Sequence, residues 1–443
     1  MPYIPHTPEQ TQEMLKVVGV ESLEALFQDI PASMRPKSFN LPPGMSERAV
    51  CARLEELARA NKTDVVSFLG GGFYDHHIPA IVDALSSRGE FLTAYTPYQA
   101  EASQGTLQAI FEYQTAVSRL LDMDCANASV YDGGSALFEA CMMAVRATKR
   151  SRIVVDESLS PIYRTMLATY TTNLQLELAT VPHGGGVSDM QALLAAIDDK
   201  TAAVVVQNPT FFGTIHDYTA LFAQAKAKGA VSVLTCYPVL QSILKTPGQM
   251  GADVAVAEGQ SLGLPLSFGG PYLGIMTCTR EIVRQMPGRI VGRTVDHQGR
   301  TGYVLTLQAR EQHIRRAKAT SNICSNQALC AFRAYVTLCV LGPQGLARMA
   351  EDAVDKAHYA AARLAALPGV RLLSDAPFGN EFAVVLPRNA HEVVDKCASR
   401  GLVPGFPLGG YFAGMDNVLL VACTEKTSRE QIGHLAEMVG GLL

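Results

Sequence analysis

The Gly-rich stretch 259–271 resembles a cofactor-binding turn but contains no lysine. Gln260 and Ser261 stand near its start, and no lysine occurs anywhere between Lys245 and Lys318. An amide or a hydroxyl cannot form an imine with an aldehyde or exchange one with an amino-acid substrate, whereas a lysine amine can. The stretch therefore lacks a group for covalent attachment of a carbonyl compound.

A second Gly-rich turn has the parts of an anion site. It follows a predicted strand at 128–132 and opens a predicted helix, so backbone N–H groups and a hydroxyl converge there. The residues of this turn are Gly133, Gly134 and Ser135. Turns of this composition also serve as plain connectors, and that alternative stays open.

The order of these turns in an alternation of strands and helices is typical of enzymes that hold pyridoxal phosphate (PLP) as a Schiff base on a lysine. Gln260 and Ser261 stand about where that lysine is expected. Such enzymes also place a carboxylate beside the pyridine nitrogen, at the end of a strand that reads Val-Ser-Val-Leu-Thr-Cys here (231–236). Because two chemical roles are missing, we predict that this chain does not hold PLP in the usual way. The turn at 133–135 is then a degenerate anion site.

A polar and aromatic segment, Tyr95-Thr-Pro-Tyr-Gln99, precedes an apolar helical pattern. Proline stiffens this turn, and two phenols and an amide are presented together. We predict a contribution to an active site or an interface from Tyr95, Tyr98, Gln99 and Ser103. A plain turn whose tyrosines pack as cover is the alternative.

Positive charge is concentrated in residues 284–318, which hold eight Lys or Arg residues against the two acids Asp296 and Glu311. The densest part is followed directly by residues able to form hydrogen bonds. We predict that it faces an anionic partner or ligand, with contributions from Arg315, Arg316, Lys318, Ser321 and Asn322. A solvated basic surface is the alternative.

The adjacent His76 and His77 could suggest a metal site. An unsupported pair in an Asp-His-His run is more often hydrogen-bonded structure, because no third ligand accompanies it at a metal-binding spacing. We therefore expect no metal.

Composition narrows the class of protein. A formal net charge of −4 argues against a general nucleic-acid binder. The ten cysteines include no Cys-x-x-Cys pair, which suits a reducing compartment. The N-terminus shows no secretory pattern, and no apolar stretch approaches the length of a membrane span. These features predict a cytoplasmic, soluble protein.

The length of 443 residues favours two domains and an arm. We predict an N-terminal helical arm at 1–63, which either wraps a partner subunit or packs on its own domain. Continuous apolar runs that alternate with helices predict an α/β domain with a mostly parallel sheet at 64–330. A small α+β domain is predicted at 331–443.

Several motifs together resemble the glycine decarboxylase (P-protein) family of the glycine cleavage system. They are Gly70-Gly-Gly-Phe-Tyr-Asp-His-His-Ile-Pro79, Tyr95-Thr-Pro-Tyr-Gln99, Ser103-Gln-Gly105, Pro287-Gly-Arg-Ile-Val-Gly-Arg293 and the run 310–324. The resemblance covers essentially the whole chain and is to subunit 1 (alpha) of enzymes split into two related subunits. It implies the PLP-dependent transferase-like architecture called fold type I.

The resemblance also implies partners. An α2β2 heterotetramer would pair this chain with subunit 2, which carries PLP and decarboxylates glycine. The aminomethyl group would then pass to the lipoyl arm of the H-protein. This chain would be inert alone and would complete the site from across the interface. A scaffold that only stabilises subunit 2 is the alternative, while an independent PLP-free enzyme lacks a nucleophile–base set.

Overall fold

The computed structural model describes residues 6–443, so Met1–Pro5, the start of the segment inspected for a secretory pattern, lie outside the described residues. The chain divides into two compact units, Met1–Thr63 and Asp64–Leu443. Each is described by itself.

The first unit is helical. Helix α1 (Pro8–Val18) begins with a capping box between Thr7 and Gln10. It ends at Gly19, whose φ of 82° is a left-handed conformation that suits glycine. Helix α2 (Glu47–Arg59) is capped by the hydroxyl of Ser46. Two short 3-10 helices lie between them, η1 (Glu24–Phe27) and η2 (Ala32–Met34).

A seven-stranded sheet forms the centre of the second unit, in the order β2-β8-β7-β6-β5-β3-β4. The strands from β7 to β4 pair in parallel, while β8 is antiparallel to both its neighbours. The bounds are β2 (Cys125–Ala126), β3 (Arg152–Asp156), β4 (Glu177–Val181), β5 (Thr201–Asn208), β6 (Val231–Cys236), β7 (Val254–Glu258) and β8 (Gly274–Cys278). The predicted mostly parallel sheet is confirmed.

Helices cover both faces of this sheet, which explains why its strands are continuous apolar runs. One face packs on α6 (Gly133–Thr148), with α7 (Pro161–Thr171) beside it. The other face packs on two helical pairs. These are α8 (Met190–Ala196) with α9 (Thr219–Ala227), and α5 (Gln104–Leu121) with α12 (Ala328–Ala365). Shorter helices are α3 (Ala80–Ser86), α4 (Gly89–Leu92), α10 (Pro247–Met250), α11 (Gln312–Arg315), η3 (Ala100–Ala102), η4 (Val239–Ser242), η5 (Arg280–Gln285), η6 (Gln308–Arg310) and η7 (Arg316–Lys318).

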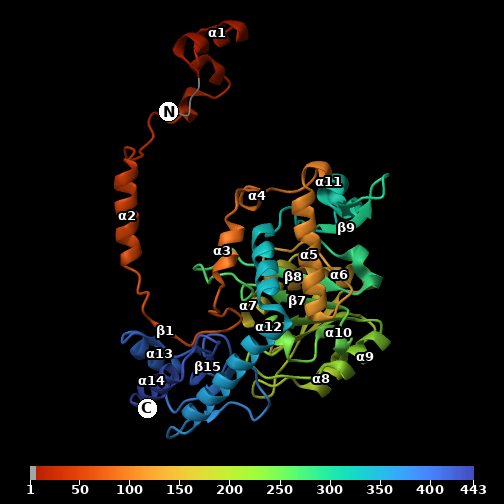
Figure 1. Cartoon of the computed structure of the whole chain (residues 1–443), viewed down its shortest axis with the longest axis vertical. Coiled ribbons are helices and arrows are strands. Elements are labelled where there is room, and N and C mark those ends of the chain that lie inside the picture. The colour runs from red at the N-terminus through yellow and green to blue at the C-terminus, as the bar shows by residue number, and fades with distance from the viewer. Residues whose placement is uncertain (1–5) are drawn as a thin grey trace. The chain divides into compact units, whose positions relative to one another are not determined.

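A smaller antiparallel sheet, β11-β12-β15-β14, packs against the second half of α12 and two C-terminal helices. Its bounds are β11 (Arg371–Leu372), β12 (Glu381–Val385), β14 (Phe406–Pro407) and β15 (Val418–Ala422), and the helices are α13 (Ala390–Ala398) and α14 (Arg429–Gly440). The short strand β1 (Val66–Ser67) pairs in parallel with β13 (Leu402–Val403), so the start of this unit lies beside the blue C-terminal elements in Figure 1.

Helix α12 corrects two expectations. The helical pattern at about 345–367 predicts a helix that begins near residue 345, whereas α12 begins at Ala328. Non-helical backbone at Gly342, before Pro343, joins its two helical segments. By length and composition, α12 is long and apolar enough to cross a membrane, and it is the one such helix among the described residues. The expectation that no apolar stretch approaches this length was therefore wrong. Core helices pass the same test, and Ala334 and Leu346 of α12 are buried in the core.

Two local expectations were wrong because tertiary contacts compete with local patterns. The spacing of Ser188 and Gln191 predicts a capping box at the start of α8. The Ser188 hydroxyl is instead bound to Asp156 and Tyr218, and Asp189 caps the helix. The predicted strand at 128–132 is reduced to a single bridge between Val130 and Gly274. An unpredicted hairpin follows the sheet, β9 (Ile290–Val295) with β10 (Thr301–Thr306).

Candidate functional site

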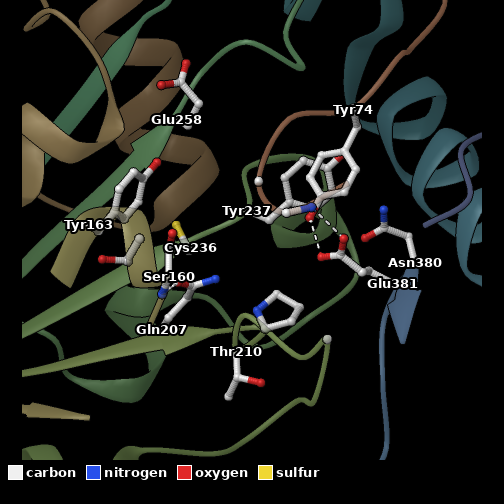
Figure 2. Close-up of a pocket in the computed structure, with 15 residues that line it drawn as sticks. Tyr74, Ser160, Tyr163, Gln207, Thr210, Cys236, Tyr237, Glu258, Asn380 and Glu381 are labelled. Carbon is white, nitrogen blue, oxygen red and sulfur yellow. Dashed lines mark hydrogen bonds between the residues drawn. The ribbon is translucent and has the colours of Figure 1, made fainter. Parts of the chain in front are cut away.

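A pocket with about 540 Å³ of empty space lies at the carboxyl ends of β5, β6 and β7. Figure 2 shows its walls, which come from these strands, from the loop after β1 and from β12 of the small sheet. Ligands of open α/β sheets bind outside the carboxyl ends of the strands. The pocket is therefore the first candidate for a site.

The predicted anion site at the start of α6 is filled by the chain's own carboxyl group. Glu258, the last residue of β7, accepts hydrogen bonds from the backbone N–H of Gly133 (2.9 Å), Gln260 (3.0 Å) and Leu273 (3.1 Å). Asp132 caps the same helix by accepting from the Ser135 N–H at 2.7 Å. These acidic groups satisfy the helix N-terminus that a phosphate would otherwise occupy.

Glu258 lies in a buried site, where desolvation disfavours its ionised form. Burial raises its pKa to about 7, although the three N–H donors favour the ionised form. Gly133 is needed for this close approach, because a Cβ there would lie 2.4 Å from the Tyr163 hydroxyl and 3.0 Å from the backbone nitrogen of Glu258. Gly133, which suggested a phosphate-binding turn in the sequence, instead lets the start of α6 pack against the Glu258 carboxyl group.

Gln260, near the expected position of a lysine, has a structural role. Its buried amide accepts from the Tyr74 N–H at 2.9 Å and donates to the carbonyl oxygens of Tyr74 and Leu264. The neighbouring Ser261 hydroxyl is buried and has no hydrogen-bond partner among the described residues. The amide thus ties the Gly-rich stretch to the segment around residue 74.

The described residues do not fit PLP on this chain. The sequence has no lysine between Lys245 and Lys318, which includes β7 and the stretch after it, and the strand β6 ends in Thr235 and Cys236 rather than a carboxylate. Glu258 occupies the helix N-terminus, and no Lys or Arg is among the described residues that line the pocket. A phosphate brought here would meet a carboxylate without a compensating cation.

Sequence reasoning missed a buried carboxyl group on the small sheet. Glu381 accepts from the Gly71 N–H at 2.6 Å and from the Tyr74 hydroxyl at 2.9 Å, as Figure 2 shows for Tyr74. Burial raises the pKa of Glu381 to about 7. The run at 70–79 was noted as a family motif, but no local pattern links it to a strand about 300 residues later.

The histidine pair is hydrogen-bonded structure, as predicted. His76 is buried, its Nδ1 lies 2.5 Å from a carboxylate oxygen of Glu425, and its Nε2 is bonded to the Tyr237 hydroxyl. The His77 N–H donates to the same carboxylate at 2.6 Å. Tyr237 lines the pocket, so a carboxylate–imidazole–phenol chain ends there.

The structure brings the segment 95–99 beside the hairpin and the run 310–325. The Tyr98 hydroxyl accepts from the Arg289 guanidinium at 2.9 Å, and the Tyr98 ring packs edge-on to His313. The exposed Tyr95 has its hydroxyl 3.3 Å from that of Ser325. Two segments that were predicted separately therefore form one surface, which we call the Tyr95 surface.

The other predicted residues take no part in the contacts of the Tyr95 surface given above. Arg315, Arg316 and Lys318 are exposed and form no ion pair with the described residues. The Ser321 hydroxyl donates to Glu139 of α6 at 2.6 Å. Gln99 and Asn322 are exposed, and Ser103 is half-buried at the start of α5. None of the nine predicted residues is among the described residues that line the 540 Å³ pocket.

Comparison with known proteins places this geometry in context. The model of the glycine cleavage system P-protein family matches residues 1–439. A relative from Nitratidesulfovibrio vulgaris (Hildenborough), named probable glycine dehydrogenase (decarboxylating) subunit 1, is 72% identical over 443 residues and 100% of both chains. A crystal structure of an inhibitor-bound glycine decarboxylase (P-protein) is 44% identical, with a TM-score of 0.92 and 100% of both chains covered.

More distant structures share only the fold. Glutamate decarboxylase from Lactobacillus brevis is 13% identical with a TM-score of 0.70, over 95% of this chain and 96% of that chain. This agrees with the predicted PLP-dependent fold type I architecture. With the family model covering nearly the whole sequence, the chain belongs to the glycine cleavage system P-protein family.

Proposed function

We propose that this chain is subunit 1 of a glycine dehydrogenase (decarboxylating), active only with a second, related subunit. The observation that carries the proposal is 72% identity over the full length of a relative with that name. The enzyme would decarboxylate glycine and transfer the remaining aminomethyl group to the lipoyl arm of the H-protein. The ten cysteines are free thiols, which supports a reducing, cytoplasmic location.

The pocket supports different roles for the two subunits. Subunit 2 would hold PLP, which supplies an electron sink when CO2 leaves glycine. This chain would not, because Glu258 fills its helix N-terminus and Gln260 replaces the attachment group. We propose an α2β2 assembly in which subunit 1 lines the active site of subunit 2.

The Tyr95 surface is the proposed contribution of this chain. It offers exposed phenols at Tyr95 and Tyr98, and the exposed cations Arg315, Arg316 and Lys318 follow His313, which packs on Tyr98, in the sequence. Phenols and cations of this kind suit the glycine carboxylate, the cofactor phosphate, or acids of subunit 2 or the H-protein. The competing proposal is a scaffold that stabilises subunit 2 and contributes no group to the reaction.

The first prediction concerns covalent attachment. After reconstitution with PLP and reduction with borohydride, this chain is expected to carry no stoichiometric phosphopyridoxyl group, because no lysine is near the end of β7. Peptide mapping of both subunits from the active mixture is the measurement, with label on subunit 2 as the positive control. Stoichiometric label on a lysine of this chain would contradict the proposal.

The second prediction concerns the basic cluster. Arg315→Ala and Arg316→Ala are each expected to weaken assembly or to lower glycine–bicarbonate exchange at least tenfold. Removing an ordinary exposed charge changes the free energy of folding by only about 0.5 kcal/mol or less. Arg371→Ala, at an exposed arginine of β11 that forms no ion pair with the described residues, is the matched control. Sedimentation of the subunit mixture tests whether the cluster contacts acids of subunit 2. The exchange assay with and without H-protein separates a contact with the H-protein from one with the glycine carboxylate or the cofactor phosphate. Parent-like assembly and turnover at low and high salt would make the cluster a solvated surface.

A further inference from the structure

Carboxyl groups face the central pocket without a cation. No Lys, Arg or His is among the described residues that line it. Figure 2 shows Glu381 on the Tyr74 side and Glu258 apart from it. Glu258 accepts from three N–H groups, whereas Glu381, among the residues that the structure describes, accepts only from Gly71 and Tyr74. A carboxylate has about four acceptor positions, so Glu381 keeps the capacity to accept more hydrogen bonds.

The chain of side chains behind Tyr237 makes that phenol a second acceptor. Burial alone would raise the pKa of Glu425, but the hydrogen bond and charge of His76 bring it below the ordinary value. An ionised carboxylate only accepts, so Nδ1 of His76 carries a proton, while Nε2 either accepts from the Tyr237 hydroxyl or donates to it. A phenol oxygen has two lone pairs, so in both arrangements Tyr237 keeps one that can face the pocket.

Thr235 supplies an independent indication of a ligand. It lines the pocket at the end of β6, and only 4% of the residue is exposed. Its hydroxyl has no hydrogen-bond partner among the described residues. A buried hydroxyl without a partner is costly, and most such groups in folded proteins are satisfied. A donor on a bound molecule would satisfy it.

We propose that this pocket binds a small primary ammonium ion that carries no carboxylate, with its N–H groups donating to Glu381, Tyr237 and Thr235. An ammonium group has three donors, which matches the three acceptors. It also brings the positive charge that a buried carboxylate needs. Acids and zwitterionic amino acids are excluded, because their own carboxylate would find no cation in the pocket. The ligand would join the segment 71–74 to the small sheet.

Calorimetric titration of methylammonium chloride into the full chain tests the proposal. Saturable binding with one site per chain is expected, while glycine, sodium acetate and sodium chloride at matched concentration give no saturable heat. The measurement needs neither subunit 2 nor glycine turnover, so its result is independent of the proposed enzymatic function. Absence of saturable methylammonium binding by the folded parent chain would overturn the proposal.

Two variants locate the site. Glu381→Gln is expected to weaken methylammonium binding roughly tenfold or more, because a charged acceptor is lost. Thr235→Val is expected to weaken it several-fold without lowering the melting temperature, because that hydroxyl has no protein partner to lose. Glu392→Gln on the exposed side of α13 should bind like the parent. If Glu381→Gln does not fold, Thr235→Val decides alone, and parent-like binding by it overturns the assignment.

Discussion

Replacing Glu258 with alanine is expected to lower the free energy of unfolding by about 3 kcal/mol, because three buried N–H donors lose their acceptor. Those donors belong to Gly133, Gln260 and Leu273. The loss is smaller than the cost of leaving three buried N–H groups without any acceptor. Burial raises the pKa of Glu258, so removing this side chain also removes the cost of burying its charge. Denaturant unfolding of the full chain, followed by circular dichroism, is the measurement.

Acetate provides a specific check on this interpretation. It replaces the carboxylate fragment missing from Glu258→Ala, so it should raise the melting temperature of the variant more than that of the parent. Glu281→Ala, at an exposed glutamate of η5, is the matched control and should change stability by no more than about 0.5 kcal/mol. A Glu258→Ala variant as stable as the parent would mean that the carboxylate does not stabilise the helix start.

Tyr95→Phe is expected to lower glycine–bicarbonate exchange by the assembled enzyme by about ten- to a thousand-fold, the range for losing a positioning or hydrogen-bonding group near a reacting centre. The variant should fold normally, because Tyr95 is 80% exposed and its hydroxyl makes a single long contact to Ser325. Activity and the sedimentation of the subunit mixture are measured on the same preparations.

Three further variants sharpen the result. Tyr98→Phe and Gln99→Ala are expected to lose activity too, and Tyr98→Phe also removes an acceptor from the buried Arg289. Tyr170→Phe is the matched control, since it is a half-exposed phenol on α7 outside the Tyr95 surface. Unchanged exchange in Tyr95→Phe, Tyr98→Phe and Gln99→Ala alike would favour the scaffold proposal.

Patterns within a few residues were read correctly where the local physics was decisive. The sequence predicts a capping box of Thr7 with Gln10 and an N-cap at Ser428, and these residues begin α1 and α14, because the side chains of the cap and of the N3 residue meet through the helix geometry itself. The apolar runs became strands of a mostly parallel sheet, since a sheet covered on both faces buries both sides of its central strands. The same pattern was misleading at 128–132, where the neighbouring chain offers only one bridge.

The sequence by itself determined what this chain lacks: no lysine in the Gly-rich stretch and no carboxylate at the end of β6. It also determined the family, because full-length motifs do not depend on folding being known. Only the tertiary structure decided what replaced the missing groups. Glu258 meets Gly133 from 125 residues away, and Glu381 meets Gly71 from 310 residues away. Burial and pairing of a carboxyl group are set by contacts between distant segments, and these leave no periodic signal along the chain.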